Sequence, residues 1–109
     1  MLIAGRYYSL LPGELYALYG KPKIFKVDSE SNPNHKEEYE YDISVDNFVG
    51  VWSTNEMILV IQEPIRIAVM NSDDWFVHYC YQILHPYCGM CYFLCNVDDK
   101  NARIIPALI

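Results

Sequence analysis

Apolar and polar residues alternate along much of the chain, with the period of two that β-strands produce. Residues 39–46 (YEYDISVD) place an aromatic or aliphatic side chain at every second position and an acidic or hydroxyl one between. Such alternation indicates a strand with one buried and one solvated face. Other short apolar runs are separated by Pro, Gly, Asn and Asp, which favour turns. These runs cover residues 6–11, 15–19, 23–28, 47–52, 56–61, 65–70 and 102–105.

The longest apolar run, residues 75–97, is rich in aromatic and β-branched side chains, which fit a pleated sheet. Pro86 and Gly89 interrupt it, so we expect two antiparallel strands around a six-residue loop at 85–90. The resulting register pairs Leu84 with Cys91, Gln82 with Phe93, and Cys80 with Cys95, the last at a separation that a disulfide can span. One face then carries Cys80, Gln82, Leu84, Cys91, Phe93 and Cys95, and the other Trp75, Val77, Tyr79, Tyr81, Ile83, Tyr92 and Leu94. Because both faces are mostly apolar, we expect this pair at the centre of a sheet or covered on both sides.

A helix competes for part of this run. Ser72 followed by Asp73 and Asp74 has the character of an N-cap with acidic residues in the first turn. The aromatic and β-branched content of residues 75–84 favours the strand instead. The whole pattern predicts a single domain over residues 1–109 that is all-β and mainly antiparallel. We expect a small barrel or sandwich of seven to nine short strands, with little helix.

Length and charge narrow the function classes. The chain has 109 residues, a formal net charge of −6 and no cluster of Lys and Arg, so nucleic-acid binding is not expected. No apolar run reaches the roughly 20 residues of a membrane helix, and no basic segment precedes the apolar start as in a signal peptide. The four cysteines then indicate a reducing compartment with free thiols. We expect a cytoplasmic protein that binds neither nucleic acid nor membrane.

The sharpest candidate for chemistry is a group of cysteines with a nearby histidine. Cys88 and Cys91 have the two-residue spacing with which two thiolates reach one zinc ion, and His85 and Cys95 could complete four ligands. The same spacing resembles the active-site pair of thioredoxin-like oxidoreductases, on residues 88–91 alone. Free cysteines are, however, among the most buried residue types and serve as small apolar side chains. Packing is the preferred interpretation, and structural zinc or a redox-active pair is the alternative.

The surplus of aromatic residues indicates binding rather than catalysis. The chain has ten Tyr and two Trp, types that anchor protein interfaces. No catalytic residue and no cofactor is predicted, because the paired carboxylates fall in predicted turns, where they are solvated. We expect a small acidic domain that binds another protein or a second copy of itself, with the acidic residues within 30–46 suited to a basic surface. A small-ligand pocket inside a barrel is a further alternative. The candidate interface residues are Tyr39, Tyr41, Trp52, Trp75, Tyr79, Tyr81 and Tyr92.

Overall fold

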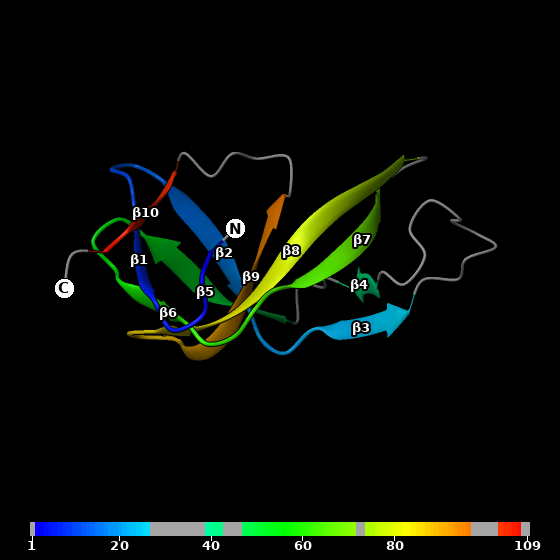
Figure 1. The fold of residues 1–109 in the computed structure, drawn as a ribbon, viewed down its shortest axis with the longest axis horizontal. Helices are drawn as coiled ribbons and strands as arrows, with labels where there is room; N and C mark the ends of the chain where they lie inside the picture. Colours follow the sequence, from blue (N-terminus) through cyan, green and yellow to red (C-terminus); the bar gives the residue numbers. More distant parts are fainter. Residues whose placement is uncertain (1, 27–38, 43–46, 72–73, 97–102, 108–109) are drawn as a thin grey trace.

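The computed structural model describes residues 2–26, 39–42, 47–71, 74–96 and 103–107. Within these ranges the chain forms ten strands and no α-helix, and one sheet joins all the strands and curls into a half-barrel (Figure 1). The strands are β1 (Tyr7–Leu10), β2 (Leu15–Tyr19), β3 (Lys23–Lys26), β4 (Tyr39–Asp42), β5 (Phe48–Ser53), β6 (Ile58–Val60), β7 (Ile65–Asn71), β8 (Asp74–His85), β9 (Gly89–Asn96) and β10 (Ile104–Pro106). The all-β prediction is confirmed, with ten strands where seven to nine were expected. None of the described segments forms a helix long and apolar enough to span a lipid bilayer.

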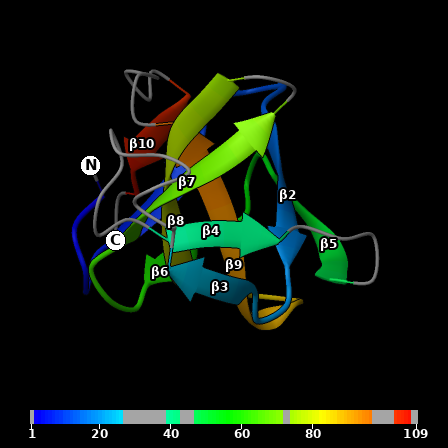
Figure 2. The same ribbon diagram turned by 90° about the vertical axis from the view of Figure 1, so that its right-hand side faces the viewer.

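The sheet is organised around β8, which is also the longest described strand at twelve residues. β9 pairs with it along one edge, while β7 and β6 share the other edge. From there the sheet continues from β6 through β1 to β10, from β7 through β4 to β3, and from β9 through β2 to β5. Figure 2 shows β5 as the outermost strand beside β2. The expected central position of the β8–β9 pair is confirmed, and the predicted strand, not the competing helix, begins at Asp74.

The register between β8 and β9 differs by one residue from the predicted one. The loop has only three residues, 86–88, because His85 pairs with Gly89. Leu84 therefore faces Met90, and Cys80 faces Leu94, so the predicted Cys80–Cys95 pair is wrong. A slip of one residue exchanges the two faces of a strand relative to its neighbour. The β9 cysteines consequently share a face with Tyr81 and Ile83 on β8, and not with Cys80 and Leu84.

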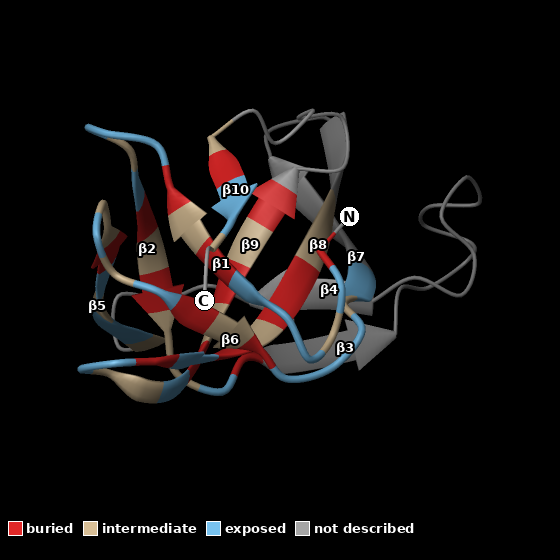
Figure 3. Ribbon diagram, turned by 60° about the vertical axis from the view of Figure 1, so that its left-hand side comes forward, coloured by how far each residue is buried: buried red, intermediate tan, exposed pale blue. Residues whose placement is uncertain are grey.

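The core lies on the face that carries Tyr81. The Phe93 ring of β9 is fully buried there, stacked on Tyr81 with the ring centroids 5.1 Å apart. Its centroid also lies 5.4 Å from that of Trp52 on β5 and 5.3 Å from that of Tyr16 on β2. Ring pairs at such distances add about 0.5–1.5 kcal/mol to the burial of their apolar surface. One aromatic cluster thus joins β2 and β5 to the β8–β9 pair, and Figure 3 shows buried positions on all of β2, β8 and β9.

Candidate functional site

The turn between β8 and β9 is built around the buried imidazole of His85. Only 2% of this residue is exposed. Its Nδ1 accepts hydrogen bonds from the backbone N–H groups of Tyr87, at 3.2 Å, and Cys88, at 3.1 Å. A nitrogen that accepts carries no proton, so the neutral ring has its proton on Nε2. Nε2 lies 3.1 Å from Oε1 of Glu56 and donates to it.

Glu56, which accepts this hydrogen bond, lies in the turn that joins β5 to β6. Its Oε1 also accepts from the backbone N–H of Ser53 at 2.7 Å and from the Ser53 hydroxyl at 3.1 Å. Burial alone raises the pKa of Glu56, but the hydrogen bonds from Ser53 and His85 outweigh it and hold the pKa below its ordinary value. The Glu56 carbonyl accepts from the Trp52 indole N–H at 2.7 Å. This network, which we call the seam (Ser53, Glu56, His85), ties the β5–β6 turn to the β8–β9 turn.

The seam has the residue types of a hydrolase triad but not its arrangement. In a nucleophilic triad the imidazole lies between the hydroxyl and the carboxylate, and takes the hydroxyl proton. Here the carboxylate of Glu56 lies between them, and the Ser53 hydroxyl donates to it. Both ring nitrogens of His85 are already engaged. The seam therefore links the two turns, and it provides no base for a nucleophile.

The four metal-ligand candidates are not brought together as a site. Cys91 and Cys95 are buried, and Cys88 is half-buried in the turn. Burial, with a smaller contribution from Cys88, raises the pKa of the Cys91 thiol to about 11, the opposite of what a reactive thiolate needs. His85 uses one nitrogen on Glu56 and the other on two amides. Over the described ranges, no group of three or more His, Cys, Asp or Glu side chains could hold a metal ion.

The aromatic residues chosen as interface candidates divide into three groups. Trp52 and Tyr81 are completely buried, so their assignment to a surface is corrected. Large aromatic rings bury more apolar area than other side chains, which favours them in the core. Tyr79 and Tyr92 are half-buried. The side chains of Tyr39, Tyr41 and Trp75 lie outside the described part of the structure, as do most of residues 30–46.

A different set of apolar side chains reaches the surface, and the sheet register aligns them. Tyr7 of β1 faces Leu59 of β6, Leu59 faces Leu84 of β8, and Leu84 faces Met90 of β9. Directly paired residues project from the same face of a sheet, and here it is the face opposite the core. Tyr7, Leu84 and Met90 are 36%, 43% and 51% exposed. We call this row of four residues on four neighbouring strands the outer stripe.

Polar side chains flank the outer stripe on β8. Gln82, two residues before Leu84, accepts through Oε1 a hydrogen bond of 2.7 Å from the Gln62 amide. Ile61, 37% exposed, donates its backbone N–H to the Gln82 carbonyl at 3.0 Å. An apolar strip beside hydrogen-bonded amides has the layout of a protein interface, in which an apolar centre adjoins a polar rim.

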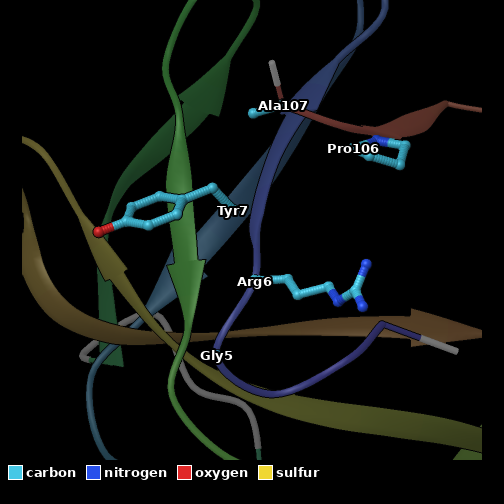
Figure 4. Close-up of a pocket in the computed structure, with 5 residues that line it drawn as sticks. All are labelled: Gly5, Arg6, Tyr7, Pro106 and Ala107. Atoms are coloured by element: carbon cyan, nitrogen blue, oxygen red, sulfur yellow. The ribbon is translucent and has the colours of Figure 1, made fainter. Parts of the chain in front are cut away.

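A pocket of about 320 Å³ adjoins the other end of the stripe. Tyr7 belongs to both, and the remaining lining residues are Gly5, Arg6, Pro106 and Ala107 (Figure 4). The Arg6 side chain extends below Pro106, whereas the Tyr7 ring points away from it (Figure 4). Among the described residues that line the pocket, Arg6 carries a charge.

The outer stripe was not found from the sequence. Its β6 segment, ILV, is apolar throughout, so no alternation separates the half-buried Leu59 from its buried neighbours Ile58 and Val60. Comparisons with protein-family models, with curated proteins and with solved structures find no match for the chain.

Proposed function

We propose that the protein is a non-catalytic binding domain that docks a partner protein, or a second copy of itself, on the outer stripe. The observation that supports this most is the unbroken register of Tyr7, Leu59, Leu84 and Met90 across four strands, with three of the four more than a third exposed. Contiguous apolar surface at a sheet face mostly marks an interaction site in a folded protein. A cytoplasmic location, where four free thiols persist, is part of the proposal.

The composition of the stripe suits a protein partner. Leu84 and Met90 face each other next to the hairpin turn, and Met side chains adapt to irregular partner surfaces. Tyr7 offers a ring and a hydroxyl at the opposite end, beside the positive charge of Arg6. The hydrogen-bonded Gln62 and Gln82 give the outer stripe a polar flank. Neither carries a charge, so a partner that binds there has no charge of theirs to desolvate.

The substitution Leu84→Glu tests the proposal, because it places a charge within the stripe. Sedimentation equilibrium over a wide concentration range measures self-association, and affinity capture from the native host measures binding to another protein. We expect Leu84→Glu to weaken the interaction at least tenfold, about 1.4 kcal/mol or more. Leu15→Glu is the matched control, since Leu15 is 61% exposed on β2, outside the stripe.

The control should behave as the wild type. If the wild type neither self-associates nor captures a partner whose retention depends on Leu84, the stripe is not a docking surface. Equal losses for both variants would point to general surface hydrophobicity rather than to the stripe.

A further inference from the structure

The turn that ends the outer stripe depends on an unprotonated ring nitrogen. His85 Nδ1 accepts the N–H groups two and three residues further along the chain, Tyr87 and Cys88. An Asn or Asp side-chain oxygen makes the same local bonds in turns and at helix starts. Here the acceptor is an imidazole nitrogen, and histidine is the side-chain type that most often serves as a proton-operated switch near neutral pH.

A proton on Nδ1 would turn this acceptor into a donor. It would then face two further N–H donors, both within 3.2 Å. The titratable groups around the ring are Glu56 from the β5–β6 turn, Tyr87 and Cys88 from the β8–β9 turn of His85 itself, and Cys91 further along the same face of β9. The Glu56 carboxylate at Nε2 favours the cation, but it offers nothing to the second N–H. Residues 86–88 would therefore have to move to give that N–H water as a partner.

Opening the turn would reach the stripe directly. His85 and Gly89 form the last pair of the β8–β9 ladder, and Leu84 and Met90 form the pair before it. The Tyr87 ring, 83% exposed, lies with its centroid 5.9 Å from that of His85. Loss of the two turn hydrogen bonds leaves the Leu84–Met90 pair at a frayed hairpin end.

We infer that His85 is a proton-sensitive latch, closed when the imidazole is neutral and opened by a proton on Nδ1, that disorganises the Leu84–Met90 end of the outer stripe. The part that concerns regulation of binding rests on the proposed function. The opening of the turn itself does not, and can be observed in the isolated protein.

The test follows amide hydrogen exchange by NMR between pH 7.5 and pH 5.0, with each rate corrected for its intrinsic pH dependence. We expect protection of the Tyr87 and Cys88 amides to fall about tenfold or more, along the same titration curve as the His85 ring signals. The Gly13 amide is the internal control, because it donates to the Thr54 hydroxyl at 3.0 Å in a turn without histidine. Its protection should stay constant.

Two variants separate the latch from general loosening in acid. His85→Asn keeps a side-chain acceptor near the two amides but does not titrate, so its turn should stay protected at both pH values. Glu56→Gln removes the carboxylate that favours the cation, so its opening should move to lower pH. Unchanged protection in the wild type, or pH-dependent loss in His85→Asn equal to that of the wild type, would overturn the inference. Should His85→Asn not fold, the wild-type comparison with Gly13 still decides.

Failure of the latch and failure of the stripe give different results. If the stripe binds at pH 7.5 in a Leu84-dependent manner but the turn does not respond to pH, the latch is refuted and the proposed function stands. If the turn opens in acid but the stripe binds nothing, the proposed function is refuted and the opening of the turn stands.

Discussion

Gly50 of β5 packs closely against the thiol of Cys88. A Cβ at this position would lie 2.6 Å from the Cys88 Sγ, far inside van der Waals contact. We predict that Gly50→Ala destabilises the protein by about 1–3 kcal/mol, as overpacking does, measured by urea unfolding. Gly20→Ala is the matched control on the adjoining segment, since its Cβ would meet Val49 at 3.7 Å, an ordinary contact.

A second substitution identifies the cause of the Gly50 effect. Cys88→Ala removes the Sγ, so the double variant Gly50→Ala, Cys88→Ala should recover most of the loss in a double-mutant cycle. A loss that persists without the Sγ would place the requirement in the β5 backbone instead.

Because the pKa of Glu56 is lowered, part of the free energy of unfolding is lost at low pH. A carboxyl whose pKa is lowered on folding contributes stability that is complete above its unfolded pKa, near 4.5, and is lost as the pH falls through the folded value. We predict that Glu56→Gln costs about 1–2 kcal/mol at pH 7. The difference from the wild type should shrink below about pH 4.5. A difference that stays constant from pH 7 to pH 3 would show that the charge of Glu56 contributes nothing.

At the scale of the elements, the hairpin register decides which thiols can react. Cys80, Cys91 and Cys95 are buried, and burial raises the pKa of Cys80 to about 12. A thiol with that pKa is about one part in ten thousand thiolate at pH 8, and the thiolate is the reactive form. We predict one rapidly titrating thiol in the native protein, assigned to Cys88 by its loss in Cys88→Ala, and four after denaturation.

The thiol titration also tests the zinc and redox alternatives. Two native thiols that react together would support a redox function for Cys88 and Cys91, and stoichiometric zinc in the purified protein would support a metal site. Oxidation should not join Cys80 to Cys95, because Cys80 faces Leu94 and its side chain lies on the opposite face.

The strands could be predicted from the sequence, but the register of β8 and β9 could not. Alternation and turn residues locate each strand from its own local pattern. The register depends on the contrast between two faces, and residues 75–97 are apolar on both. The three-residue loop carries two bonds to His85 Nδ1, from the amides of residues 87 and 88, and no sequence pattern indicated them.

The candidate site was missed for a related reason. Residue type suggested Trp52 and Tyr81 for the surface, but the half-barrel needs their volume in its core. The exposed Leu84 and Met90 look like core residues in the sequence. Their exposure follows from the register that sets them opposite each other.

At the scale of the whole molecule, Phe93 joins the β2–β5 pair to the β8–β9 pair. Its ring contacts Tyr81 on β8, Trp52 on β5 and Tyr16 on β2, and so adds side-chain contacts between β9 and the β2–β5 pair. β2 and β9 share a single ladder pair, Tyr19 with Tyr92. The curl of the sheet therefore depends on side-chain packing more than on the β2–β9 ladder.

We predict that Phe93→Ala costs about 3–5 kcal/mol, a large part of the 5–15 kcal/mol that stabilises a typical domain. Phe93→Leu, which keeps most of the volume, should cost less. If the chain is one domain, the β2–β5 pair and the rest of the sheet lose their structure together. Far-UV circular dichroism and Trp52 fluorescence, recorded with Trp75 replaced by Phe, must then give the same midpoint in urea. Fluorescence that changes before the backbone signal would mean that β2 and β5 unfold separately, and that the sheet is two units joined at one aromatic contact.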